Sequence, residues 1–99
     1  MLVPFPHSIQ VGGLEYQVVI DPKLLEKEGI VGLCSHNELK ISLFPLLRGL
    51  MNINFWHESI YCIDKVFFHN KLDETETNAL ANGIYQVLKG MGIEIDWEE

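Results

Sequence analysis

The sequence predicts an α+β fold in which a small antiparallel sheet packs against a pair of helices. Two observations lead to this prediction. Residues 8–43 carry apolar side chains in alternation, which is typical of half-buried strands, and turn signals divide them. Residues 45–91 carry apolar side chains at three- and four-residue spacing, which is typical of amphipathic helices. Because 99 residues suffice for one core and not for two, we expect a single domain over residues 1–99.

The first half predicts two hairpins. In SIQVGGLEYQVVI, residues 8–20, the alternation runs on both sides of Gly12-Gly13, and glycine accepts the positive φ of a tight turn. DPKLLEKEG follows as a short helix or turn that closes at Gly29. The segments IVGLCS and ELKISLF then flank His36-Asn37, which indicates a second hairpin with one apolar face formed by Leu39, Ile41 and Leu43.

The second half predicts two helices. The first runs from Pro45 to about His69, with Gly49 and residues 52–54 as candidate breaks. The second begins at Asp73, because Glu76 three residues later completes a capping box. Its apolar stripe consists of Leu80, Ile84, Val87, Leu88 and Met91. The tail IEIDWEE alternates, which suits either a short strand or an unpacked end.

Composition and charge narrow the possible functions. The net charge is −7, and the seven Lys and Arg residues are spread singly, so direct nucleic-acid binding is disfavoured. An acidic surface suits a basic protein partner, or serves solubility alone. No apolar run reaches the ~18 residues of a membrane span, and the N-terminus lacks a signal-peptide pattern, so we expect a cytoplasmic protein. We expect Cys34 and Cys62 to be buried and reduced.

The candidate site lies in FWHESIYCID, residues 55–64. In an H-E-x-x-H helix, two histidines one turn apart hold zinc on one face, and the glutamate acts on the bound water as general base. Here His57 and Glu58 are present, but the last position of the motif is Tyr61. Asp64 lies about 10.5 Å further along the helix axis than His57, which is too far for the two to share one ion.

A downstream acid could complete such a site. Glu74 and Glu76 both lie in the first turn of the second helix, and periodicity does not choose between them. Glu76 already has a role in the capping box, whereas Glu74 has Asn78 one turn later as a supporting partner.

Four segments together resemble the ImmA/IrrE-type zinc metallopeptidases, and more narrowly their small members encoded by phages and prophages of Gram-positive bacteria. The segments are IQVGGLEYQVVI, ELKISL, FWHESIYCI and LDETETNALANGIYQVL, and the resemblance covers about residues 8 to 90. The family carries HExxH in its long helix and E-x-x-A-N-x-(Phe/Leu)-Ala in the next one. In this chain the second pattern falls on Glu74, Thr77, Asn78, Leu80 and Ala81.

The resemblance implies a zincin-like helix pair and a role for each matched residue. His57 would be the first zinc ligand, Glu58 the general base, Glu74 the third ligand and Asn78 its neighbour. Tyr61 stands where the family has its second histidine, and a phenol with a pKa of about 10 is a poor ligand. We therefore expect zinc binding to be weakened by more than the 10–100-fold typical of losing a supporting residue. Tyr61 is then either a metal ligand or a side chain that fills the space of the former site, with its hydroxyl hydrogen-bonded across that space.

Two principal hypotheses for function follow. The first is a zinc-dependent peptidase or its remnant, with a peptide lying antiparallel to an edge strand that we expect within residues 38–43. The second is a non-catalytic phage accessory protein that binds a host or phage protein through the same fold, which Tyr61 and the acidic charge favour. A third, a DNA-mimicking inhibitor, is weaker because the acidic residues are scattered rather than massed.

Overall fold

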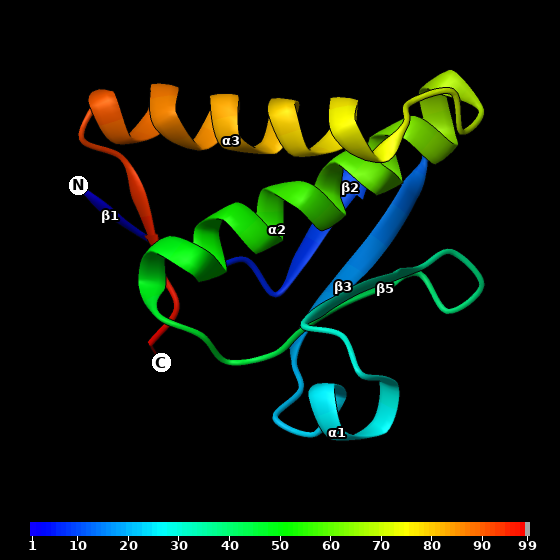
Figure 1. Ribbon diagram of the computed structural model, residues 1–99, viewed down its shortest axis with the longest axis horizontal. Coiled ribbons are helices and arrows are strands. Elements are labelled where there is room, and N and C mark those ends of the chain that lie inside the picture. Colours follow the sequence, from blue (N-terminus) through cyan, green and yellow to red (C-terminus); the bar gives the residue numbers. More distant parts are fainter. Residues whose placement is uncertain (99) are drawn as a thin grey trace.

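The computed structural model describes residues 1–98 and confirms the α+β class (Figure 1). Its strands are β1 (Leu2–Pro4), β2 (Ser8–Val11), β3 (Leu14–Ile20), β4 (Gly32–Ser35), β5 (Lys40–Leu43) and β6 (Glu94–Asp96). Its α-helices are α1 (Leu24–Glu28), α2 (Arg48–Ile63) and α3 (Glu74–Gly90), and α2 continues into a π-helical segment, η1 (Asp64–Phe68).

Both predicted hairpins are present, but they meet through a parallel pair. The four strands of the main sheet are ordered β2-β3-β5-β4, with β3 parallel to β5 and the two hairpin pairs antiparallel. The predicted sheet is wholly antiparallel, whereas the observed sheet is mixed, because β3 and β5 run parallel. The reason is the segment around α1, which carries the chain past one strand position to the edge. The turn after β4 then brings β5 back between β4 and β3, in the direction of β3.

Gly12 shows why the first hairpin needs glycine. Its φ of 63° is in the left-handed region. A Cβ added there would also lie 2.8 Å from Val66 Cγ1, so the turn packs tightly against η1.

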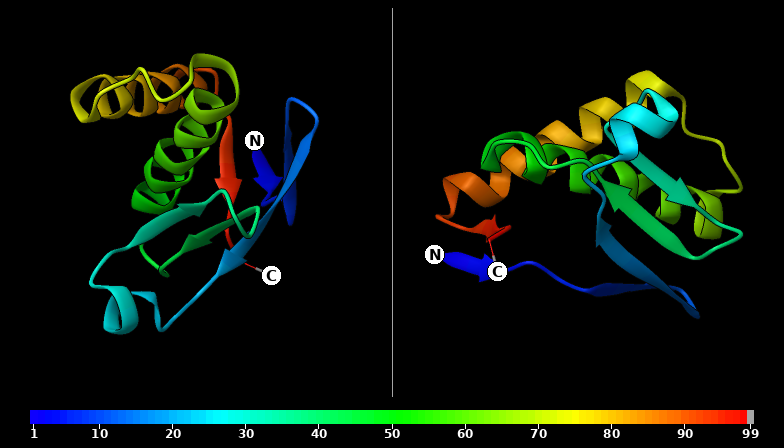
Figure 2. Two further views of the ribbon diagram at one scale, coloured as in Figure 1. Left: turned by 90° about the vertical axis from the view of Figure 1, so that its right-hand side faces the viewer. Right: turned by 90° about the horizontal axis from the view of Figure 1, so that it is seen from below.

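Helix α2 lies across one face of the main sheet, and α3 lies on the side of α2 away from the sheet (Figures 1 and 2). The candidate breaks at Gly49 and residues 52–54 do not interrupt α2. The core forms between the sheet and α2 from buried apolar side chains, among them Tyr16, Val18, Ile41, Leu43, Met51, Phe55 and Cys62. This central position makes α2 the element that can present a side chain to both the sheet and α3.

The apolar stripe predicted for α3 is largely not its buried face. Leu80, Val87 and Met91 are exposed, and the buried residues of the helix are Thr77 and Ala81. Since α3 contacts α2 rather than the sheet, small residues at the contact let the two helices approach closely. The first turn of α3 is therefore held near the end of α2.

Asn52 joins the tail of the chain to α2. It is only 2% exposed, its Nδ2 donates to the carbonyls of Ile95 and Arg48, and its Oδ1 accepts from the Ile95 N–H. Strand β6 itself pairs in parallel with β1, so the alternating tail is a strand and both chain ends lie together. The asparagine thus satisfies the groups of β6 that face the helix.

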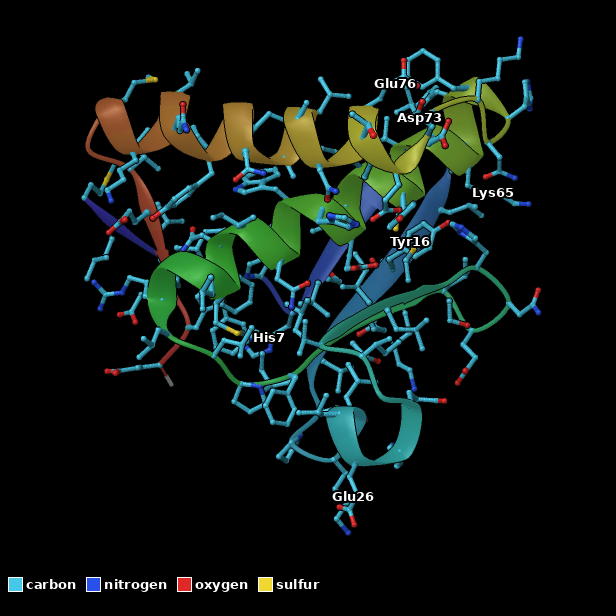
Figure 3. The ribbon with its side chains drawn as sticks, viewed as in Figure 1. His7, Tyr16, Glu26, Lys65, Asp73 and Glu76 are labelled. Atoms are coloured by element: carbon cyan, nitrogen blue, oxygen red, sulfur yellow. The ribbon has the colours of Figure 1, made fainter. Side chains whose placement is uncertain are left out.

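Polar caps order the connection between α2 and α3. The buried Asp64 carboxylate accepts from the N–H groups of Lys71 and Leu72, while His69 and Asn70 adopt left-handed conformations. Asp73 and Glu76, labelled in Figure 3, form the predicted capping box at the start of α3. No helix within residues 1–98 is long and apolar enough to cross a membrane.

Candidate functional site

The residues singled out in α2 and α3 come together at one point. His57 and Tyr61 lie one turn apart on α2, with their rings edge to face and centroids 4.9 Å apart. Glu74, in the first turn of α3, reaches both: its Oε1 lies 3.3 Å from His57 Nε2, and its Oε2 accepts a hydrogen bond from the Tyr61 hydroxyl. Glu74 is therefore the acid that meets His57.

Other candidates have different places. Glu76 is engaged in the capping box, and Asp64 in the cap of the connection. Asn78 is exposed one turn after Glu74, and its carbonyl accepts from the Asn82 side chain.

Glu58 is a buried carboxyl group that forms no ion pair with any of residues 1–98. The residue is 6% exposed. Burial, with a smaller contribution from the negative charge of Glu74, raises the pKa of Glu58 from 4.5 to about 7. A carboxyl group in a cleft whose pKa is shifted by burial and a neighbouring charge is a candidate functional group.

Tyr61 remains a protonated phenol in this setting. Burial, its hydrogen bond to Glu74 and the charges of Glu74 and Glu58 all raise the pKa of Tyr61. The hydroxyl therefore donates to Glu74 and holds α2 against α3.

The cluster offers two of the three ordinary protein donors that a catalytic zinc ion uses. Such sites use three protein ligands and leave one position open. His57 and Glu74 are ordinary zinc donors, but Tyr61 presents a proton, and releasing that proton is made harder by its neighbours. Within residues 1–98, no three His, Cys, Asp or Glu side chains are arranged to hold a metal ion.

Two adjoining cavities of about 500 and 400 Å³ flank the cluster. Both are lined by Ile30, Gly32, His57 and Glu58. The larger continues along the start of α2 past Leu50, and the smaller continues past Tyr61 to Glu74. Together they form a cleft between β4 and α2, which we call the β4–α2 cleft, with Glu58 at its middle.

Strand β4 is the edge of the sheet beside this cleft. The expected edge, residues 38–43, is wrong, because β5 lies between β3 and β4. The physical reason is again the crossover through α1, which places the first strand of the second hairpin outermost.

The outer edge of β4 carries backbone groups that do not bond to β5. Pairs in an antiparallel ladder alternate between bonded and non-bonded, and the bond from Phe44 N–H to the Val31 carbonyl fixes which pairs are bonded. It follows that the backbone N–H and C=O groups of Leu33 and Ser35 form hydrogen bonds with β5. Those of Gly32 and Cys34 point away from β5.

Gly32 and Asn54 are parts of the site that sequence reasoning missed. A Cβ on Gly32 would lie 2.3 Å from Asn54 Oδ1 and 2.7 Å from Glu58 Oε2, so a larger residue there would displace both side chains. Asn54 Nδ2 also donates to the Val31 carbonyl at 2.7 Å and anchors the start of the strand. A glycine inside a predicted strand is the signal that could have indicated such a close approach.

Comparisons of the chain with protein-family models, curated protein sequences and solved structures found no match. The function is therefore inferred from the residues of the site.

Proposed function

We propose that the chain is a peptide-binding relative of the ImmA/IrrE-type metallopeptidases. An extended segment of a partner protein would enter the β4–α2 cleft and add a strand to β4. The observation that carries this proposal is the outer edge of β4 running beside a cleft with the buried acid Glu58 at its middle. Strand addition to an exposed sheet edge is a common mode of peptide recognition.

Backbone pairing supplies part of the affinity. The outward N–H and C=O groups of Gly32 and Cys34 can each form a hydrogen bond with the peptide, and each bond contributes a net of about 0.5–1.5 kcal/mol. Backbone hydrogen bonds alone would therefore give a weak complex, and side-chain contacts would supply any further affinity.

The acids of the cleft indicate which side chain a peptide should bring. Glu58 and Glu74 both line the cavity beside β4, and the whole chain carries a net charge of −7. A Lys or Arg of the peptide would neutralise one of these carboxylates and lower the pKa of Glu58. Arginine is favoured because it can bond a carboxylate with two parallel N–H groups.

In this proposal the cluster of His57, Tyr61 and Glu74 fastens α2 to α3 without a metal, as the Tyr61 hydrogen bond to Glu74 favours. The partner would be a host or phage protein in the cytoplasm, as the resemblance implies.

Selection from a pooled library of linear synthetic peptides, on the immobilised chain and with a zinc chelator present, tests the proposal. The best binder is then resynthesised with one N-methylated residue at a time. Strand addition predicts that methylation at alternate positions abolishes binding, since every second N–H faces β4. Failure to enrich any peptide, or equal tolerance of methylation at all positions, would contradict it.

A matched pair of variants tests the role of charge. Glu74→Gln should weaken the binding of an Arg-containing peptide. Glu26→Gln, at an exposed position of α1 that does not line the cleft, should leave binding unchanged. Equal effects of the two variants would show that only net charge matters.

A second candidate function is peptide hydrolysis with zinc, as the resemblance implies. The approach of His57 Nε2 to within 3.3 Å of Glu74 Oε1 favours it, because both side chains are ordinary zinc donors. Elemental analysis distinguishes the two functions. It is made on tag-free protein after zinc addition and dialysis, with His57→Ala as the control. Near-stoichiometric zinc that disappears in the variant would favour hydrolysis, and no zinc in either would leave peptide binding.

A further inference from the structure

Two cysteines from distant parts of the chain meet at the wall of the cleft. Cys34 of β4 and Cys62 of α2 are both free thiols, and their Sγ atoms lie 2.7 Å apart. This is closer than ordinary contact between sulfur atoms and little more than the ~2.05 Å of a disulfide bond. The proximity arises from the same close approach of β4 to α2 that Gly32 permits.

The two thiols differ in access. Cys34 is half-buried and lines the 400 Å³ cavity, so a small solute can reach it. Cys62 is fully buried behind it, at 0% exposure. An oxidant that enters the cleft therefore meets Cys34 first.

A proton acceptor stands beside Cys34. His36 Nδ1 lies 3.9 Å from Cys34 Sγ and 3.0 Å from the hydroxyl of the buried Tyr16. In the tautomer that leaves Nδ1 without a hydrogen, this nitrogen has one lone pair, for which the Tyr16 hydroxyl and the Cys34 thiol compete. It can accept the proton of the Cys34 thiol when the Tyr16 hydroxyl releases it.

We propose that Cys34 and Cys62 form a reversible disulfide when the chain meets hydrogen peroxide. Cys34 passes its proton to His36, and its sulfur attacks one peroxide oxygen. The O–O bond breaks, and the departing hydroxide takes the proton from His36 to become water. Cys62 sulfur then attacks the resulting sulfenic acid, the S–O bond breaks, and the hydroxide leaves as a second water with the Cys62 proton. Two thiols are oxidised to one disulfide and one peroxide is reduced to two waters.

The bond would tie the edge strand to the helix beside the cleft. It does not depend on the peptide binding proposed above, because it needs only the two thiols and a small oxidant. A later thiol reductant restores both cysteines by exchange.

The test uses the full chain, reduced, desalted and exposed to hydrogen peroxide. Wild-type protein should lose both titratable thiols and the mass of two hydrogen atoms. Trypsin without reductant should then release residues 28–40 linked to residues 49–65, the fragments that hold Cys34 and Cys62. The same reaction in strong denaturant should form this link more slowly, because unfolding separates the two sulfurs.

Single-cysteine variants separate the steps. In Cys62→Ala, the remaining Cys34 should gain oxygen, since no second thiol can resolve the sulfenic acid. In Cys34→Ala, Cys62 should stay reduced. His36→Asn should slow thiol loss in the otherwise wild-type chain. Persistence of both thiols at a peroxide concentration that oxidises a short cysteine peptide would overturn the proposal. Gain of oxygen without a link, or a link only between separate chains, would overturn it equally.

Discussion

Replacing Glu58 by glutamine tests whether the middle of the cleft holds a destabilising charge. Glu58 is 6% exposed, and its pKa rises from 4.5 to about 7 on folding. A rise of this size corresponds to about 3 kcal/mol of lost stability once the group is ionised. Glutamine has almost the same shape and no charge, so it removes this cost.

The sign follows from linkage. Because the folded pKa lies above the unfolded one, the folded chain holds this proton more tightly. The contribution of this proton to the free energy of unfolding is fully present below about pH 4.5. It declines as the pH rises and is lost above about pH 7. We therefore expect the stability of Glu58→Gln relative to wild type to increase by about 2–3 kcal/mol between about pH 5 and about pH 8.5.

Urea unfolding followed by tryptophan fluorescence, across this pH range and at constant ionic strength, measures the difference. Glu26→Gln is the matched control, because it removes an exposed charge from α1 (Figure 3). Its stability relative to wild type should stay constant within about 0.5 kcal/mol. A Glu58→Gln difference that does not vary with pH would refute the burial of an ionised carboxyl group at this position.

Three further substitutions test separate parts of the structure. Gly32→Ala should cost about 1–3 kcal/mol in thermal unfolding, because its Cβ would lie 2.3 Å from Asn54 Oδ1; Gly83→Ala, where nothing lies within 4 Å, should not destabilise. Asn52→Ala should cost about 2–4 kcal/mol and speed exchange of the Ile95 amide, because it leaves buried groups of β6 unpaired; unchanged exchange would contradict this. Tyr61→His should bind near-stoichiometric zinc by elemental analysis, since it supplies a third strong ligand, whereas Tyr61→Phe should not. Absence of zinc from both variants would show that the side chains at positions 57, 61 and 74 do not approach one another closely enough to hold one ion.

Local patterns predicted the parts of the fold that depend on neighbouring residues. Gly12-Gly13 gives the first hairpin because a two-residue turn needs positive φ, and Gly12 has it. Asp73 and Glu76 form the capping box because its partners are three residues apart in any helix that begins there. Local patterns did not choose between Glu74 and Glu76 as the downstream acid, and the structure places Glu74 against His57.

The remaining features depend on contacts between distant segments. The parallel pairing of β3 with β5 is set by the crossover through α1, which alternation of side chains does not encode. The apolar stripe of α3 is largely exposed, because periodicity identifies an apolar face but not whether a neighbour covers it. The closeness of Gly32 to Glu58, and of Cys34 to Cys62, requires the register of β4 against α2.

Amide hydrogen exchange in β4 tests most directly whether a peptide adds a strand to this edge. In the free chain, the amides of Leu33 and Ser35 should exchange slowly and those of Gly32 and Cys34 quickly. Saturation with a selected peptide, in the presence of a zinc chelator, should slow Gly32 and Cys34 while leaving the other two unchanged. If the peptide binds and the exchange of Gly32 and Cys34 does not slow, strand addition to β4 is wrong.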